Sequence, residues 1–532
     1  MPSPFNRPPS LIVSAVALAG IVLSAAAVGI IGFDVWWDLT TGWIIANLKM
    51  IPHYDLFSYT AFGRPWVNHQ WLYQLIQWLA YEHFGVGGML ALKTLILAGI
   101  SAILFRSITY LSSSRNMALW GVILFIWGVA NKELDRPMMV VLLLLAAFIL
   151  ILHKYIREGG WAVWTLPVLQ VIWINSHGGG LLGVMAIFAF AAGESLQPFC
   201  RERLGGPEPI EKARRHRLWL TGLLCLTASL INPWGADIFL YYGELRKMTL
   251  TLQYTQEWLT PLHPLIKYSI PQYIYLAIAA AAFASHVLNA SRVRLSHLFL
   301  SAGTVMLLCK GHRFGSEMMI ANLPLICLNL TERFPSLAGT TAGRSWISAI
   351  AALVVSALAL TFGIPMKFDR KPENMMGIYA PGYSAPARLV SFLEYHGIKG
   401  RVFNDMGLGA YLIFRRWPGE PVFIDGRTPI YGDDFFIRFS DAFVQSKNFE
   451  DLKKEYQFDY IVLANYNSKD IRQVHDYLFH NPEWRLVYAM DDGYVYLRNV
   501  PKFRKLIEKL ALKRHPLLEE LEKMEREERS DE

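Results

Sequence analysis

The 532-residue sequence is poor in cysteine and in charge. Its 4 cysteines are too few for a disulfide scaffold, and all of them lie in or beside apolar stretches. Charged residues make up 18% of the chain, against about 25% in average soluble domains, and hydrophobic residues reach 53%. This composition excludes a disordered chain, and the crowding of apolar residues into the first two-thirds excludes an ordinary soluble enzyme.

Several catalytic signatures are also absent. The sequence contains no P-loop, no His-Glu-x-x-His, no metal-spaced pair of cysteines and no nucleophile elbow. ATP-driven transport and metalloprotease chemistry therefore lack support. The basic clusters are short and have no interleaved aromatic residues, so no nucleic-acid partner is predicted.

Long apolar stretches dominate residues 1–365. Because about 20 apolar residues cross about 30 Å of hydrocarbon, we predict a polytopic α-helical membrane protein with about 11 transmembrane helices in the lipid bilayer. The first stretch is longer than a typical signal-peptide core, which favours an uncleaved span. The predicted spans are 11–31, 87–105, 117–131, 138–153, 161–175, 180–199, 218–231, 271–289, 295–309, 314–330 and 345–364.

Lysine and arginine are distributed unequally between the loops. With the N-terminus inside, the inside loops are roughly threefold richer in these residues than the outside loops. The net charge of +8 is therefore mainly a topology signal. It predicts a multi-pass protein with a cytoplasmic N-terminus and an extracytoplasmic C-terminal domain.

The composition changes near residue 366 to a soluble α/β pattern. We predict a transmembrane domain over 1–365 with a large first outside loop, 32–86, a soluble domain over 366–500, and a charged, solvated helical tail over 501–532. Expected helices are Ala385–His396 and Phe449–Tyr456, and expected strands are Arg401–Asn404, Pro421–Asp425, Tyr460–Ala464, Leu486–Ala489 and Tyr494–Arg498, the last two joined as a hairpin.

The first outside loop combines tryptophans with carboxylates. Asp34 and Asp38 are four residues apart, on one face of any helix there, and Trp36 and Trp37 lie between them. A carboxylate beside apolar rings should have a raised pKa, which suits a general base. The alternatives are a pair of solvated helix caps and an ordinary interfacial tryptophan belt. Farther on, Trp66, Trp71 and Trp78 predict an amphipathic helix lying in the interface plane.

Other unusual polar residues also fall at outside ends of spans, where ionisable groups mark function by default. Arg136, Lys310 and Arg313 suit a phosphate, although Arg136 could be an interface anchor. His177 precedes a glycine run that would let a ligand approach the backbone, or that only connects two spans. His69 and Glu257 are further candidates, and together these residues predict one outward-facing site.

Motifs along most of the chain resemble the GT-C superfamily of membrane glycosyltransferases, and more closely a bacterial group within it. The matching segments are Asp34-Val35-Trp36-Trp37, Ile51-Pro52 with Asp55 and Phe57-Ser58-Tyr59-Thr60, Gly63-Arg64-Pro65-Trp66, His69, Trp71-Leu72, Arg136-Pro137, His177-Gly178-Gly179, Gly400-Arg401-Val402-Phe403-Asn404, Gly409-Ala410-Tyr411-Leu412 and Val422-Phe423-Ile424-Asp425-Gly426-Arg427.

The resemblance implies sugar transfer from a polyprenyl-phosphate sugar to a glycan, lipid or protein acceptor, with Asp34 as base and Asp38 as a second catalytic acid. Arg136, Lys310 and Arg313 would hold the donor phosphate, and His69, His177, Glu257, Trp36 and Trp37 would position substrate. Position 38 is expected to be His in the bacterial group, and the two acids are not adjacent. No cofactor is implied beyond a possible divalent metal. The alternative is a non-catalytic transporter or assembly subunit for lipid-linked glycans.

Overall fold

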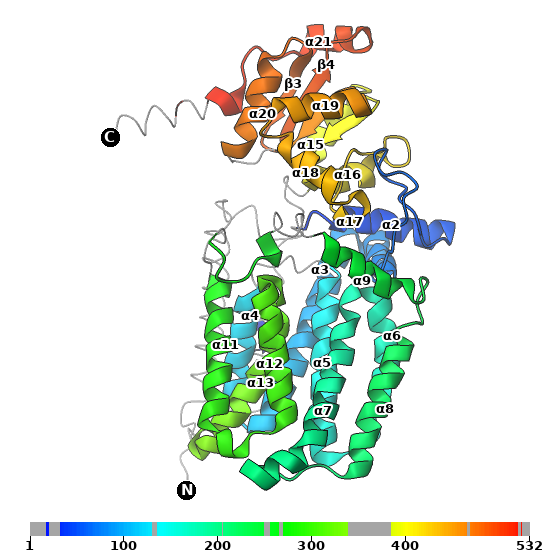
Figure 1. Ribbon diagram of the computed structural model, residues 1–532. Helices are drawn as coiled ribbons and strands as arrows, with labels where there is room; N and C mark the ends of the chain where they lie inside the picture. The colour runs from blue at the N-terminus through cyan, green and yellow to red at the C-terminus, as the bar shows by residue number, and fades with distance from the viewer. Residues whose placement is uncertain are drawn as a thin grey trace. The chain divides into compact units, whose positions relative to one another are not determined.

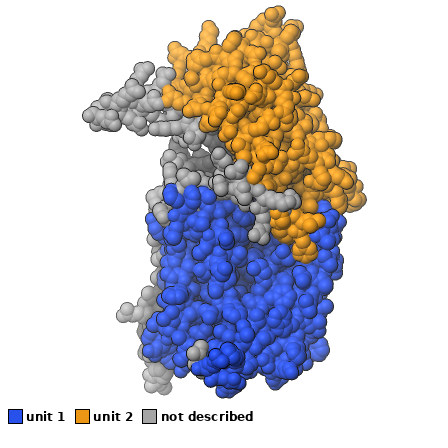
Figure 2. All heavy atoms as spheres, viewed as in Figure 1, with its two compact units in different colours: residues 1–29, 69–238, 255–379 blue, residues 30–68, 239–254, 380–532 orange. Residues whose placement is uncertain are grey.

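The computed structural model describes residues 18–20, 32–129, 136–204, 206–248, 256–264, 270–338, 385–464, 469–519 and 523. The chain divides into two compact units, coloured separately in Figure 2. Unit 1 comprises residues 1–29, 69–238 and 255–379, and unit 2 comprises residues 30–68, 239–254 and 380–532. The segment predicted as the first outside loop is thus split, because its residues up to 68 belong with residues 380–532 in unit 2.

Unit 1 consists of helices (Figure 1). Its longer described helices are α3 (Trp71–Ser112), α4 (Arg115–Val129), α5 (Met138–Glu158), α6 (Leu166–Ser176), α7 (Leu181–Leu204), α8 (Lys212–Ala228), α11 (Ile270–Leu288), α12 (Leu295–Lys310) and α13 (Gly315–Arg333). Short 3₁₀ turns adjoin them, η2 (Ala162–Thr165), η3 (Gly178–Gly180), η4 (Gln256–Trp258), η5 (Ala290–Arg292), η6 (His312–Phe314) and η7 (Pro335–Leu337). Helix α9 (Asp237–Lys247) lies at the division between the units.

Helix α13 is the most enclosed helix of unit 1. It packs against α3, α4, α11 and α12, and most of its residues are buried. Its interior amides are satisfied across helices, since Asn322 Nδ2 donates to Thr304 Oγ1 (3.0 Å) and Asn329 Nδ2 to Ser285 Oγ (3.1 Å). Such hydrogen bonds offset the free-energy cost of burying polar side chains inside a bundle of apolar helices.

Four described helices are long and apolar enough to cross a membrane, namely Trp71–Ser112, Met138–Glu158, Gly178–Arg203 and Pro271–Leu288. Three shorter apolar helices, Arg115–Val129, Ala162–Ser176 and Leu295–Lys310, also match predicted spans. The predicted spans 218–231 and 314–330 fall in α8 and α13, which do not meet that criterion. Span 345–364 and nearly all of 11–31 lie outside the described residues, so the number eleven is not confirmed.

Helix α3 is two helices that meet at a kink at Gly85, so the helix predicted through Trp71 and Trp78 is separate from the helix that follows it. Its 42 residues would measure about 63 Å if straight, roughly twice the hydrocarbon thickness. Gly85 interrupts it with non-helical angles (φ 59°, ψ −147°), which glycine adopts without steric cost. The helix begins at Trp71, so Trp66 is not part of it, contrary to the sequence prediction.

Unit 2 contains a four-stranded mixed sheet in the order β1-β2-β4-β3. The parallel pair is β1 (Val402–Asn404) and β2 (Tyr460–Leu463), and β4 (Gly493–Arg498) is antiparallel to β2 and to β3 (Trp484–Met490). The predicted hairpin at Asp491–Gly493 is confirmed. The helices are α2 (Val35–Leu48), α15 (Ala387–Tyr395), α16 (Met406–Arg416), α17 (Thr428–Tyr431), α18 (Asp433–Asp441), α19 (Ser446–Tyr456), α20 (Lys469–His480) and α21 (Arg504–Leu510), with the turn η9 (Pro501–Phe503).

One strand prediction for this unit is wrong. Segment Pro421–Asp425 is buried and apolar but is not a strand, since Val422 makes only an isolated bridge with Ser58 and Phe423 N donates to Asn404 Oδ1. The backbone groups of this short buried run form hydrogen bonds with side chains and with the segment around Ser58, and not with a neighbouring strand of the sheet. Most residues of the predicted tail over 501–519 are exposed, while Phe503, His515 and Leu517 are buried.

Candidate functional site

Five segments of unit 1 bring the predicted polar residues to helix ends. His69 precedes α3, Arg136 precedes α5, His177 lies between α6 and η3, Glu257 is in η4, and Arg313 is in η6 just before α13. The segments preceding α3, α5 and α13 place their side chains at helix N-termini, where the backbone dipoles favour negative charge. The contacts among these five residues define what we call the arginine–histidine cluster.

The two histidines of the cluster are oriented by backbone amides. Gly178 N donates to His69 Nδ1 (3.2 Å), and Gly179 N donates to His177 Nδ1 (2.8 Å). The ring centroids are 5.5 Å apart in an edge-to-face arrangement. Burial, assisted by the charge of Arg313, lowers the pKa of His69 to about 4. Burial also lowers the pKa of His177 well below its usual value, with His69 and Arg313 adding to the effect. Both rings are therefore neutral near pH 7.

The two arginines of the cluster share one carboxylate. Arg313 Nη1 donates to Glu257 Oε1 (2.8 Å), and Arg136 Nη1 lies 3.9 Å from Glu257 Oε2. The Arg313 guanidinium also covers the Trp258 ring, 4.2 Å from its centroid, which fixes its plane. All three charged side chains remain partly exposed. Arginine side chains in such a group are suited to contact an anionic ligand.

Lys310 does not join the cluster. It ends α12 with an exposed side chain, and within the part of the chain that the structure describes it makes no ion pair. Its predicted role in phosphate binding therefore gains no support from contacts. Asp135, which the sequence placed beside Arg136, lies outside the described residues.

Asp34 lies in unit 2 at the start of α2. Its side chain does not cap the helix, so the capping alternative is wrong for this residue. Instead Asp34 Oδ1 accepts from Trp37 Nε1 at 3.2 Å. The same oxygen lies against Gly426, where an added Cβ would come within 2.1 Å of it. Asp34 is partly exposed, and these contacts orient its carboxylate.

The neighbours of Asp34 are more deeply buried. Asp38 follows one turn later, with its backbone N bonded to Asp34 O (3.1 Å) and a side chain that is 0% exposed. Trp36 is also buried and packs edge-on against Tyr411, with ring centroids 5.0 Å apart. This packing favours structural roles for Asp38 and Trp36 over contact with a substrate.

Sequence reasoning missed a buried ion network in unit 2. Arg427 Nη2 donates to Asp55 Oδ1 (2.7 Å) and Asp425 Oδ2 (2.6 Å), and Arg427 Nε donates to Asp425 Oδ1 (2.8 Å). Tyr431 and Ser58 hydroxyls donate to Asp425 (2.8 Å) and Asp55 (2.6 Å). The segments that contain Asp55 and Arg427 were recognised as motifs in the sequence. No sequence signal indicates that these two residues, 372 positions apart, form an ion pair. The network holds the Gly426 loop against the first outside loop.

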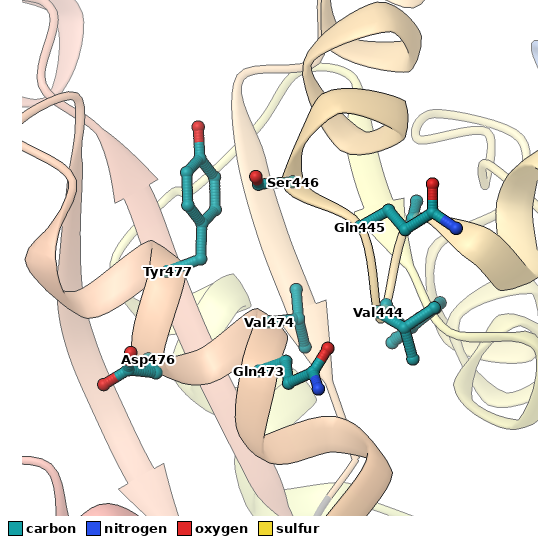
Figure 3. A pocket seen from close by; sticks show the side chains of 9 residues that line it. Val444, Gln445, Ser446, Gln473, Val474, Asp476 and Tyr477 are labelled. Carbon is teal, nitrogen blue, oxygen red and sulfur yellow. The ribbon is translucent and has the colours of Figure 1, made fainter.

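Two other kinds of site were considered, a metal site and a small-molecule pocket. Among the described residues, no group of three or more His, Cys, Asp or Glu side chains could hold a metal ion. Unit 2 has an open cavity of about 260 Å³ between the α18–α19 connection and α20 (Figure 3). Asp476 and Gln445 point in opposite directions there, so polar groups do not converge as a ligand site requires.

Comparison with known proteins identifies the fold. No family model and no curated protein matches the sequence. Among solved structures, the apo oligosaccharyltransferase of Archaeoglobus fulgidus matches with a TM-score of 0.51 at 10% identity, over 91% of this chain and 74% of that one. The same organism's oligosaccharyltransferase AglB with an inhibitory peptide and a dolichol-phosphate gives 0.49 at 12% identity (92% and 74%). Its form tethered to an acceptor peptide gives 0.47 at 11% (84% and 68%). The first of these structures shows that the chain shares the fold of that oligosaccharyltransferase.

Proposed function

We propose that the protein is a membrane glycosyltransferase that moves a sugar from a polyprenyl-phosphate donor to an extracytoplasmic acceptor. The observation that carries this proposal is the Arg136–Glu257–Arg313 group at the ends of apolar helices, in a fold shared with an oligosaccharyltransferase. Arginines at the end of the membrane-length helix α5 and beside the shorter apolar helix α12 suit the phosphate of a lipid whose chain lies in the bilayer.

In the proposed reaction, an acceptor oxygen or nitrogen attacks the anomeric carbon of the donor sugar with inversion. The bond from that carbon to the phosphate oxygen breaks, and the polyprenyl phosphate leaves with the bonding electrons. Within unit 1, Arg136 and Arg313 stabilise the charge that develops on the leaving phosphate. The role of Asp34 as the base that accepts the acceptor proton rests on the sequence resemblance. The indole N–H of Trp37 donates to Asp34 and so orients the proposed base. Trp37 would thus act through Asp34 instead of contacting the substrate.

The membrane topology in this proposal is the one predicted from the sequence. It comprises about 11 spans in the bacterial inner membrane, a cytoplasmic N-terminus and an extracytoplasmic C-terminal domain. Lys310 would add long-range attraction for the phosphate. Glu257 would act as the counter-ion of Arg136 and Arg313. Reporter fusions after residues 115, 215 and 370 test the topology, since reporter activity placing residue 370 inside would contradict it.

Mass spectrometry of envelope glycans and lipid-linked intermediates in a deletion strain tests the function. Loss of one glycan product together with accumulation of its polyprenyl-phosphate sugar is expected, and it would identify the donor and acceptor. Unchanged glycans and intermediates would overturn the proposal. Accumulation of the completed lipid-linked glycan would favour the transporter or assembly-subunit alternative.

A further inference from the structure

His177 is held in one tautomer by its own loop. The residue is extended (φ −167°, ψ 145°) between α6 and η3, and its Nδ1 accepts the Gly179 N–H at 2.8 Å. A ring nitrogen that accepts an amide hydrogen bond carries no proton, so the proton of the neutral ring is on Nε2. The loop therefore presents His177 as a hydrogen-bond donor through Nε2.

His177 is also kept neutral by its surroundings. The groups that act on it are the His69 ring, 5.5 Å away between centroids, and the permanent charge of Arg313. Burial is the largest reason that its pKa lies well below the usual range. Between pH 6 and 8 the ring can donate from Nε2, but it is neither a cation nor a general base.

The first turns of α5 connect His177 to the arginines. A Cβ on Gly179 would lie 3.0 Å from the Val141 side chain, so the glycine of the His177 loop packs directly on α5. One turn earlier, Met138 Sδ lies 3.9 Å from Arg313 Nη2. The His177 loop and Arg313 thus both contact the first turn of α5, and Arg136 lies two residues before that helix.

We propose that His177 donates its Nε2–H to an oxygen of the phosphate monoester or diester that Arg136 and Arg313 bind. This inference rests on the proposed function, because it names a third donor for the same phosphate. A neutral donor adds binding and orientation without adding charge, so the leaving phosphate is not held by a third cation. His69 packs edge-on against this ring and acts as a positioning residue.

Substitution by asparagine separates this role from a structural one. Asn Oδ1 can accept the Gly179 N–H as His177 Nδ1 does, since asparagine is a favoured cap, but it has no donor at the position of Nε2. His177→Gln offers a longer side chain with an amide donor. His83→Asn, at an exposed position of α3, serves as the matched control.

The test measures binding of farnesyl phosphate, inorganic phosphate and farnesol to the full-length protein in nanodiscs. Because a hydrogen bond to a charged group is worth about tenfold to a hundredfold in affinity, His177→Asn should weaken farnesyl phosphate binding by that factor. Farnesol binding should not change, His177→Gln should recover part of the loss, and His83→Asn should bind as wild type. Equal weakening for inorganic phosphate would support the donor and identify free phosphate as a ligand.

Two failures are distinguishable. If Arg313→Gln loses farnesyl phosphate binding but His177→Asn binds it as wild type, the inference about His177 is wrong and the phosphate site stands. If wild type does not bind farnesyl phosphate, or Arg313→Gln leaves its affinity unchanged, the phosphate site of the proposed function is wrong as well.

Discussion

Replacing Arg427 with methionine should destabilise unit 2 far more than replacing Asp55 with asparagine. The Arg427 side chain is 2% exposed, and those of Asp55 and Asp425 are 0% exposed. Although burial alone would lower the pKa of Arg427, Asp425 and Asp55 raise it above its ordinary value, so the guanidinium stays charged. Without it, two carboxylates remain buried together, which costs about 3–5 kcal/mol.

Asp55→Asn has a different consequence. It leaves Arg427 paired one-to-one with Asp425 through Nε and Nη2, so no net charge is stranded. The remaining cost is a weakened hydrogen bond, about 1–3 kcal/mol. The order of the two effects therefore follows from the charge balance of the buried network.

Hydrogen exchange of the full-length protein, measured by mass spectrometry, gives the free energy of opening for peptides containing β1 and β2. Arg427→Met should raise their opening constant by roughly several hundredfold or more. Arg388→Gln is the control, since the Arg388–Asp491 pair is exposed and such pairs contribute about 0–1 kcal/mol. Wild-type protection in Arg427→Met, or a larger loss of protection in Asp55→Asn, would refute the reasoning.

Two further predictions concern unit 2. Burial lowers the pKa of His475 to about 3 and of His515 to about 4, so the unfolded chain binds more protons below about pH 6.5. The stability of unit 2 should thus be complete above that pH and fall as the pH drops towards 4. Hydrogen exchange at pH 7 and at pH 5 measures this change in the free energy of opening. A free energy that is equal at the two pH values, or higher at pH 5, would contradict the prediction. Gly426→Ala should push Asp34 aside and reduce glycan product without loss of folding, whereas Gly419→Ala, with its nearest atom at 3.7 Å, should leave product unchanged; equal product in both variants would exclude a positioning role for Gly426.

Local patterns predicted much of the fold. Apolar runs predicted the strands that became β1 to β4, which are buried along most of their length. The helical period of apolar residues predicted α15 and α19, which bury one face. Pro421–Asp425 failed because burial alone does not distinguish a strand from an extended segment bonded to side chains. The break in α3 at Gly85 depends on a backbone conformation that the sequence permits but does not require.

The candidate site was predicted in its members but not in its pairings. Ionisable residues beside apolar segments are costly, and that single criterion selected His69, Arg136, His177, Glu257 and Arg313. It could not show that Glu257 stands between two arginines, nor that Lys310 points to solvent. It also passed over Asp55 and Arg427, whose pairing exists only in the folded chain.

Complementation of the deletion strain with Asp34→Asn tests the catalytic proposal most directly. The substitution keeps the size of the side chain and an oxygen that can accept from Trp37 Nε1, but it removes the proposed base. At membrane levels matched to wild type, we expect no glycan product and an accumulated polyprenyl-phosphate sugar. Product formation at the wild-type level by Asp34→Asn would contradict Asp34 as the base.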